Sequence, residues 1–375
     1  MAKKAYIGVD NVARQIKKIY VGVDGVARKV KRGYIGVGGV ARLFWSGGEL
    51  AYYGTITALS TGRSVLAATS VGDYALFGGG WAASAAASSK VVDAYNKSLT
   101  RSKPTALSVA RQNLAATTVG NYALFGGGGC NDVSTYTYKN TVNAYNASLT
   151  RSSPSGLKST TEYLAATAVG NYALFGGGYS YSTNVTAYNA SLTRSYPTAL
   201  SVGLQELAAT SVGNYALFAG GKNSSNKPDT VVNAYNASLT RTTPTALSGA
   251  RFNPAATSVG NYALFAGGRN QSTRDYTTVD AYNTSLTRTT PTALAHNLEN
   301  GAATTVDNYA LFAGYTQSTG VTVYDASLTR TIPTGLSTGR YQLAAATVGS
   351  YALFGGGVAK VNTTTLATVD AYVVA

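Results

Sequence analysis

The sequence predicts an all-β fold: a seven-bladed β-propeller preceded by a small segment of three hairpins. One phrase, Asn121-Tyr-Ala-Leu-Phe-Gly-Gly-Gly128, recurs in close copies that begin at Asp73, Asn121, Asn171, Asn214, Asn261, Asn308 and Ser350. A second phrase, typified by Val142-Asn-Ala-Tyr145, alternates with it. The resulting repeat of 42 to 50 residues is rich in Tyr, Thr, Val and Gly, which suits strands joined by tight turns. A repeat of this length with several strand-like runs is typical of a propeller.

Each repeat contains four strand candidates, which we name a to d. In the second repeat they span residues 114–119 (a), 121–125 (b), 141–145 (c) and 151–157 (d). Strand a consists of small residues, which suits the crowded centre of a propeller, and strand b is apolar on both faces, as expected of a blade packed between neighbours. Six of the eight prolines lie in strand d, which should therefore be the outermost strand.

The two ends of the array predict how the ring closes. Residues 368–375 form a strand c with no strand d after it, and residues 55–60 form a strand d with no blade before it. Joining them gives seven four-stranded blades, the last closed by the N-terminal outer strand, and removes an exposed sheet edge. We therefore expect two domains, residues 1–46 and 47–375.

The N-terminal segment contains a basic triplet with a period of 14 residues. Residues 6–14 recur as 20–28 and 34–42, and each copy holds a turn-forming dipeptide between valines, which predicts three two-residue β-hairpins. Residues 1–47 carry +8 of the net charge of +15. Such a segment could bind nucleic acid or teichoic acid, but no stacked aromatics or nucleic-acid motif support this, and a solvated face or a protein partner is the better interpretation.

The triplet resembles the short YIGVDGVARKVKK-type repeats near the ends of structural proteins from phages and prophages of Gram-positive bacteria. The resemblance covers residues 5–45 and implies a segment that attaches the protein to other virion or tail proteins. The third copy ends in an apolar Leu43-Phe44-Trp45 suited to docking. The residues expected to make the attachment are Tyr6, Arg14, Tyr20, Arg28, Tyr34, Arg42, Phe44 and Trp45.

The later repeats resemble kelch repeats, which carry a diglycine after strand b and a Tyr in strand c. The resemblance covers residues 49–375. Leu149 and its equivalents depart from it, because a kelch repeat usually has Trp there, and Gly314-Tyr315 breaks the diglycine in blade six. The resemblance implies a kelch-like fold and says nothing about activity.

Length differences between the repeats are confined to one loop. The strand-c Tyr is always 27 residues before the next strand-b Tyr, whereas the spacing from b to c varies from 15 to 23 residues. Because antiparallel strands alternate ends, the b–c and d–a loops share one face, which is rich in the Tyr, Ser, Asn and Gly that binding loops favour. The candidate ligand-binding residues are Trp81, Asn131, Asp132, Tyr136, Tyr138, Tyr179, Tyr181, Arg269, Asp275, Tyr276 and Tyr315 from b–c loops, and Arg111, Tyr163, Phe252, His296 and Tyr341 from d–a loops.

Two features that recur once per blade have structural interpretations. The Asn after each strand-c Tyr begins a sequon, as in Asn146-Ala-Ser148, but local turn bonds explain the recurrence better. Arg151 and its equivalents suggest a bond to a neighbouring blade rather than a basic ring on the opposite face.

The composition argues against an enzyme, a cofactor and a metal. A single His296 and a single Cys130 leave almost nothing for a transition-metal site or a nucleophile–His–acid set, and the carboxylates are scattered singly over the blades. The sequence contains no run of about 18 apolar residues, so it predicts no membrane-spanning helix. The basic first residues lack the apolar segment of a secretory signal.

The resemblance of the triplet, together with the loop-length pattern, implies a phage or phage-tail-like particle protein, made in the bacterial cytoplasm and located in the virion, at the tail or baseplate rather than the head. Its propeller would bind a bacterial cell-surface polymer or protein through the variable loops. Two alternatives stay open: a non-catalytic head or collar decoration protein, and a cytoplasmic protein–protein adaptor. The oligomeric state is also open, a homo-oligomer included.

Overall fold

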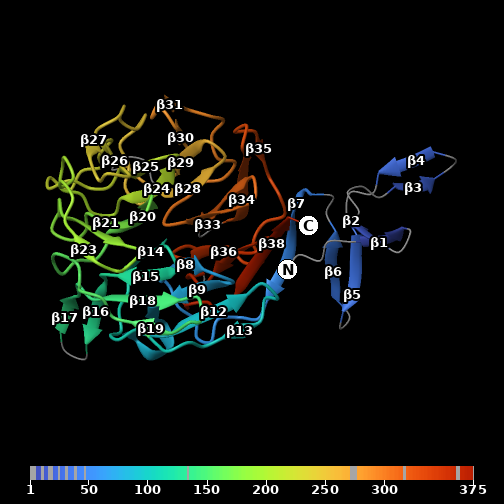
Figure 1. Ribbon diagram of the computed structural model, residues 1–375, viewed down its shortest axis with the longest axis horizontal. Coiled ribbons are helices and arrows are strands. Elements are labelled where there is room, and N and C mark those ends of the chain that lie inside the picture. The colour runs from blue at the N-terminus through green and yellow to red at the C-terminus, as the bar shows by residue number, and fades with distance from the viewer. Residues whose placement is uncertain are drawn as a thin grey trace.

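The protein folds into a ring of seven four-stranded antiparallel sheets, each of which is one blade (Figure 1). The computed structural model describes the strands of the N-terminal triplet and residues 48–374, apart from 133–134, 271–276, 316–317 and 360–363. Among these residues the only helix is a 3-10 turn, η1 (Ala83–Ala85). The prediction of an all-β, seven-bladed propeller is confirmed.

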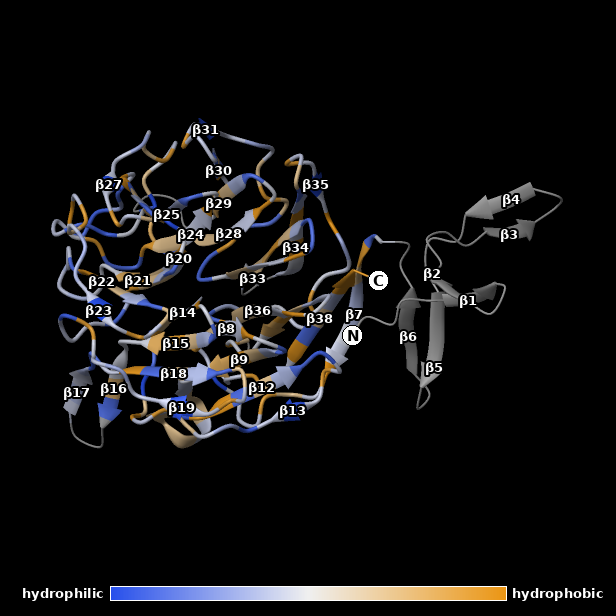
Figure 2. Ribbon diagram, viewed as in Figure 1, coloured by the Kyte–Doolittle hydropathy of each residue, from blue (hydrophilic) through white to orange (hydrophobic). Residues whose placement is uncertain are grey.

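Every blade has the same strand order, with a at the centre and d at the rim. Blade 1 consists of β8 (Ala67–Val71), β9 (Tyr74–Gly78), β12 (Val92–Asn96) and β13 (Arg101–Ser102). The a to d strands of blades 2 to 6 are, in turn, β14 (Ala115–Val119), β15 (Tyr122–Gly126), β18 (Val142–Asn146) and β19 (Arg151–Ser152); β20 (Ala165–Val169), β21 (Tyr172–Gly176), β22 (Val185–Asn189) and β23 (Arg194–Ser195); β24 (Ala208–Val212), β25 (Tyr215–Ala219), β26 (Val232–Asn236) and β27 (Arg241–Thr242); β28 (Ala255–Val259), β29 (Tyr262–Ala266), β30 (Val279–Asn283) and β31 (Arg288–Thr289); and β32 (Ala302–Val306), β33 (Tyr309–Tyr315), β34 (Ser318–Asp325) and β35 (Arg330–Thr331). Figure 2 shows hydrophilic outer strands such as β13 and β19, and more apolar inner strands such as β15 and β36.

Blade 7 closes the ring with a strand from the start of the propeller. Its inner strands are β36 (Ala344–Val348), β37 (Tyr351–Gly355) and β38 (Val369–Val374), and β7 (Leu50–Ile56) pairs with β38 on the outside. In Figure 1, blue β7 lies beside red β38. The predicted closure is confirmed, but the closing strand lies earlier than residues 55–60. The segment after Ile56 is used differently, because its carbonyls accept hydrogen bonds from blade 1.

The outermost strands are much shorter than predicted. In blade 2, strand d ends at Ser152 rather than at residue 157, so Pro154 lies beyond the strand. The carbonyls that follow face the next blade: Ser155 O accepts from Tyr188 Oη at 2.6 Å and Gly156 O accepts from Arg194. The chain after strand d therefore joins two blades instead of extending one sheet.

The core is a layer of aromatic side chains repeated between neighbouring blades. In blade 2, Phe125 and Tyr145 meet edge to face with centroids 5.9 Å apart, and both are fully buried. Tyr145 Oη donates to Thr105 O of the segment leaving blade 1, at 2.7 Å, and Arg151 donates to Ala106 O at 2.7 Å. The same Tyr bond occurs in all seven blades and the Arg bond in blades 1 to 6. The structural interpretation of the recurring Arg is confirmed.

The turn between strands c and d is closed by its own Asn side chain. Asn146 Oδ1 accepts the backbone N–H of Ser148 at 3.0 Å and of Thr150 at 2.9 Å. Leu149, at the corner, has a left-handed φ of 61°. The side-chain oxygen of the recurring Asn is thus used inside the turn, as predicted.

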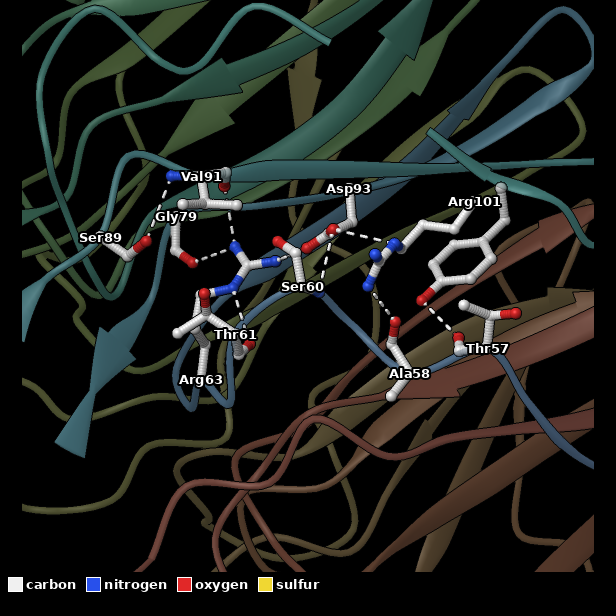
Figure 3. A network of polar contacts seen from close by, with 11 residues as sticks. Thr57, Ala58, Ser60, Thr61, Arg63, Gly79, Ser89, Val91, Asp93 and Arg101 are labelled. Carbon is white, nitrogen blue, oxygen red and sulfur yellow. Dashed lines mark hydrogen bonds and ion pairs between the residues drawn. The ribbon is translucent and has the colours of Figure 1, made fainter. Parts of the chain in front are cut away.

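A second set of buried side chains joins the d–a segment to strand c. Blades 1, 5 and 7 contain ion pairs with no exposed side-chain surface: Arg63–Asp93, Arg251–Asp280 and Arg340–Asp370. Figure 3 shows Arg63 held between the carboxylate of Asp93 and the carbonyls of Gly79 and Val91.

Arg111 is the member of this set in blade 2, and its prediction as a ligand-binding residue is wrong. Its side chain is fully buried, and its guanidinium donates to Asn143 Oδ1 at 2.7 Å and to Gly127 O at 3.2 Å. The d–a segment turns inward at this position before it reaches the surface. Arg111 was expected to be exposed because it is charged and lies in a loop, but its side chain is buried.

The N-terminal triplet forms the three predicted hairpins. β1 (Tyr6–Val9) pairs with β2 (Val12–Gln15), β3 (Tyr20–Val23) with β4 (Val26–Lys29), and β5 (Gly33–Val37) with β6 (Val40–Trp45), all antiparallel. The side chains of these strands lie outside the described part of the protein. The attachment residues from Tyr6 to Trp45 and the domain boundary at residue 46 therefore stay predictions.

Candidate functional site

The b–c and d–a loops meet around the centre of one end of the propeller, which we call the mouth. In five blades the residue after the diglycine pairs with the d–a segment of its own blade, as Gly129 does with Gln112 and Arg269 with Phe252. Two b–c loops add small hairpins, β10 (Trp81–Ala82) with β11 (Ala87–Ser88), and β16 (Gly129–Asp132) with β17 (Thr135–Tyr138). The prediction that these loops share one face is confirmed.

Seven residues, one from each blade, form a ring around this mouth. Although none is glycine, all have a left-handed backbone, with φ between 47° and 59°. We call them the mouth ring: Val65, Asn113, Tyr163, Glu206, Asn253, Asn300 and Gln342.

Backbone hydrogen bonds connect the mouth ring from blade to blade. The Asn113 N–H donates to Val65 O at 3.0 Å, and the bond from Val65 N–H to Gln342 O, at 2.9 Å, crosses the point where the ring closes. Left-handed geometry costs roughly 1–2 kcal/mol for a residue other than glycine, so the surrounding bonds must hold it. Strained positions of this kind cluster at ligand sites.

A cavity of about 550 Å³ opens at the mouth. Six of its fourteen lining residues carry side-chain amides, and Trp81, Tyr163 and Phe252 contribute aromatic rings. It is lined by Ser64, Val65, Trp81, Gln112, Asn113, Asn131, Tyr163, Glu206, Lys222, Phe252, Asn253, Arg269, Asn300 and Gln342. A volume within about 300–1,000 Å³ is typical of small-ligand sites, although this wall is more polar than most of them.

The positive charges in the cavity wall are paired within the protein. Lys222 Nζ lies 3.1 Å from Glu206 Oε2 and 4.1 Å from the centre of the Phe252 ring. Arg269 Nη1 lies 2.9 Å from Glu299 Oε1. The cavity therefore offers a ligand two compensated ion pairs rather than an uncompensated charge.

Blades 2 and 3 carry an aromatic cluster beside the cavity, which we call the tyrosine platform. Tyr138 stacks on Tyr179, with ring centroids 4.0 Å apart and an interplanar angle of 21°. Tyr136 meets Tyr138 edge to face at 5.5 Å. Tyr136 and Tyr179 are 36% and 42% exposed, so the platform presents aromatic surface to a ligand.

Glu162 connects the tyrosine platform to the cavity wall. Tyr136 Oη donates to the Glu162 carboxylate, and Asn113 Nδ2 donates to the same carboxylate at 3.0 Å. Gln112 Nε2 donates to Tyr136 Oη at 3.3 Å. Burial raises the pKa of Glu162, and a hydrogen bond with Tyr179, together with burial, raises the pKa of Tyr138 to about 12.

Apart from Arg111, the predicted ligand-binding residues fall into four groups. Five line the cavity: Trp81, Asn131, Tyr163, Phe252 and Arg269. Tyr136, Tyr138 and Tyr179 form the platform, and Tyr181, His296, Tyr315 and Tyr341 are half-buried outside the cavity lining. The Asp132 side chain, Asp275 and Tyr276 lie outside the described residues. Contact with a ligand stays a prediction for all of them.

Most of the mouth ring was missed by the sequence reasoning. Six of its members were not among the candidates, because nothing in these residue types alone marks a left-handed position: Val65, Asn113, Glu206, Asn253, Asn300 and Gln342. A signal was present nine positions before the strand-b Tyr, where the repeats carry Val, Asn, Tyr, Glu, Asn, Asn and Gln. The residue type at this position varies between repeats while the neighbouring sequence does not. That contrast points to the ring, just as the variable loop length points to the face.

Within the described part of the chain, no group of three or more His, Cys, Asp or Glu side chains is arranged to hold a metal ion. No described helix is long and apolar enough to cross a membrane. The expected absence of a cofactor stays a prediction.

Comparison with known proteins supports the fold alone. No protein-family model matches the chain, and no curated protein matches its sequence. Among solved structures, one described as "Structure of YjhT" has a TM-score of 0.55 and 12% sequence identity, covering 84% of this chain and 96% of that chain. At this identity the similarity establishes a β-propeller and no activity.

Proposed function

We propose that this protein is the non-catalytic adhesion module of a phage or phage-tail-like particle. Residues 1–46 attach it to other virion proteins, and the mouth of the propeller binds a polymer on the bacterial cell surface. The observation that carries the proposal is the concentration of side-chain variation at the mouth of an otherwise repetitive frame.

The frame is nearly identical in every blade. Strand b reads Tyr-Ala-Leu-Phe in all seven, and the strand-c Tyr makes the same bond to the preceding blade. The residue after the diglycine has the same backbone pairing in several blades, yet its side chain differs in each. The described residues at this position are Trp81, Gly129, Tyr179, Lys222, Arg269 and Val358. A propeller that only spaced or covered a particle would need no such variety at one end.

The carboxylates at the mouth support binding rather than catalysis. Glu206 is held by Lys222 and by Asn253 Nδ2, which donates at 3.0 Å, and Glu162 is held by Tyr136 and Asn113. Both carboxylates thus orient the wall around them. A glycosidase would instead need two carboxyl groups facing one bond.

Attachment to a particle rests on the resemblance of the N-terminal triplet to phage repeats. Three basic hairpins in series suit docking on another protein, because one hairpin alone is barely stable in water. Deletion of residues 1–46 should leave a folded propeller that no longer joins the particle. Incorporation of the truncated protein at the normal level would remove this part of the proposal.

The binding role is tested with labelled full-length protein and cell walls purified from a Gram-positive bacterium, with wall polymers retained or removed. We expect binding only when the polymers are retained, and loss of binding for Trp81→Ala. The matched control is Tyr196→Ala, which removes a 49% exposed aromatic side chain next to an outer strand, away from the mouth cavity. Equal binding by wild type and both variants would argue against a receptor role of the mouth.

The position of the protein on the particle distinguishes an adhesion module from a decoration protein. Electron microscopy of particles carrying a tagged copy should place an adhesion module at an exposed distal site on the tail. Labelling along the head or collar would favour a decoration protein. Absence from purified particles would favour the cytoplasmic adaptor.

A further inference from the structure

We propose that the ligand is a neutral polysaccharide, bound with one end in the mouth cavity and with the following sugars laid across the tyrosine platform. This inference rests on the proposed function and adds the chemical class of the ligand and its path. It draws on the chemistry of the cavity wall, on the pairing of its charges and on the continuity between cavity and platform.

The cavity wall is suited to hydroxyl groups. Each amide side chain presents a carbonyl that accepts a hydrogen bond and an NH₂ that donates one. A sugar hydroxyl can both donate to the carbonyl and accept from the NH₂. Six such side chains line the cavity: Gln112, Asn113, Asn131, Asn253, Asn300 and Gln342.

Two polar atoms of this wall have unmet hydrogen-bonding capacity. Gln112 Oε1 is buried and meets no donor among the described residues, and Arg269 Nε meets no acceptor there. A buried polar group without a partner costs about 1–3 kcal/mol, so a small side-chain movement that lets a ligand group reach either atom would recover part of that cost. One is an acceptor and the other a donor, which a hydroxyl-rich molecule can satisfy.

The paired charges favour a neutral ligand over an anionic one. Lys222 and Arg269 already have carboxylate partners at 3.1 and 2.9 Å. A polymer of phosphates or uronic acids would have to compete with Glu206 and Glu299 for these cations and would bring negative charge close to both. A neutral sugar leaves the ion pairs intact.

The size of the cavity requires the rest of a polymer to lie outside it. A volume of about 550 Å³ holds a few sugar units and no more. The tyrosine platform offers the next surface, because Gln112 bonds to Tyr136, which meets Tyr138, which in turn stacks on Tyr179. Sugar rings present apolar C–H faces, and rigid Tyr rings supply contact area at low entropic cost.

The platform is held in place before any ligand arrives. Glu162 fixes Tyr136 from below, and the Tyr138–Tyr179 stack fixes the outer rings. A preformed surface avoids the entropic cost of ordering side chains on binding. We therefore expect affinity to rise with the length of the oligosaccharide.

The test measures the affinity of the full-length protein for neutral oligosaccharides of increasing length, from disaccharides upward, by calorimetry. Uronic-acid oligomers and glycerol-phosphate oligomers serve as anionic probes. The variants are Gln112→Ala for the cavity, Tyr179→Ala for the platform and Tyr196→Ala as the matched surface control. Thermal unfolding checks that each variant is folded, which we expect because Tyr179 and Tyr196 are exposed.

We expect Tyr179→Ala to bind the longest neutral oligomers about tenfold more weakly and to bind disaccharides as wild type does. Gln112→Ala should weaken binding at every length, and Tyr196→Ala at none. Affinity independent of length, or a Tyr179→Ala variant with wild-type affinity, would overturn the path across the platform. Binding of the anionic oligomers alone would overturn the neutral ligand.

The two levels of the proposal fail separately. If the protein binds cell walls but none of the neutral oligosaccharides, this inference is lost and the adhesion role stands. If it binds neither walls nor oligosaccharides, the proposed function itself is refuted. Wall binding that is abolished by removal of the neutral wall polysaccharide alone would support both.

Discussion

Exchanging the buried ion pair of blade 5 for the uncharged pair of blade 6 should leave the protein nearly as stable as before. Blade 5 holds Arg251–Asp280, and the equivalent residues of blade 6 are Leu298 and Thr322. Thr322 accepts the backbone N–H of Ala295 at 3.1 Å, just as Asp280 in blade 5 accepts a backbone N–H at 3.1 Å. Each blade thus needs an oxygen here, and a carboxylate appears only where Arg faces it.

The magnitudes follow from burial. Arg251→Leu alone leaves the fully buried Asp280 without its main cation, and breaking a buried pair costs about 3–5 kcal/mol. Ser248 Oγ at 3.1 Å and Arg288 at 3.6 Å remain near the carboxylate, so we expect the lower end, about 3 kcal/mol. The double variant Arg251→Leu/Asp280→Thr removes both charges together, and we expect it within about 1.5 kcal/mol of wild type.

The assay is urea unfolding of the full chain, followed by circular dichroism, for wild type, the two single variants and the double variant. The double-mutant cycle should give a coupling of about 2 kcal/mol or more. The reasoning would be refuted if the double variant were as unstable as the sum of the singles. A cost below about 1 kcal/mol for Arg251→Leu would also refute it, because the carboxylate would then have found solvent.

Three further predictions concern the frame and the mouth. Tyr145→Phe keeps the packed ring but leaves a carbonyl of the preceding blade without its donor, so the unfolding free energy should fall by about 1–2 kcal/mol in urea titrations. Val65→Asn should raise the melting temperature, corresponding to about 1 kcal/mol, because Val is β-branched, half-buried and held at φ 47°, whereas Asn tolerates left-handed geometry; no gain would mean that the strain is absent. Burial raises the pKa of folded Glu162, so the folded state binds protons more tightly than the unfolded state and stability falls as pH rises through the interval between the two pKa values. Glu162→Gln should therefore gain stability relative to wild type as the pH rises through that interval, which urea unfolding at several pH values would measure.

Repetition explains why so much of the fold could be predicted. Seven copies of one strand establish the blade and the number of blades, and unmatched strands at the two ends identify the closure. The same reasoning overestimated strand d, because residues after Ser152 look extended whether they join their own sheet or face the next blade. It also failed at Arg111, since a loop residue that turns inward has no distinct sequence pattern. Most of the mouth ring was missed for a related reason. Val, Tyr and Glu have no preference for a left-handed backbone, so their residue types did not indicate one.

The backbone bonds of the mouth ring explain how a repetitive frame can carry a specific site. Asn113 and Tyr163 are held by main-chain bonds to their neighbours, at 3.0 and 3.1 Å, so their position depends little on their side chains. By contrast, a side chain is essential where Tyr145 reaches the preceding blade, and the lack of one matters at Gly126, where an added Cβ would lie 2.7 Å from the Phe175 ring. Changes in the frame therefore weaken the packing between blades, whereas changes at the mouth alter the side chains that the ring presents and the hydrogen bonds among them. A molecule built in this way can acquire a new ligand without a new fold, which is the property that an adhesion module facing variable cell surfaces requires.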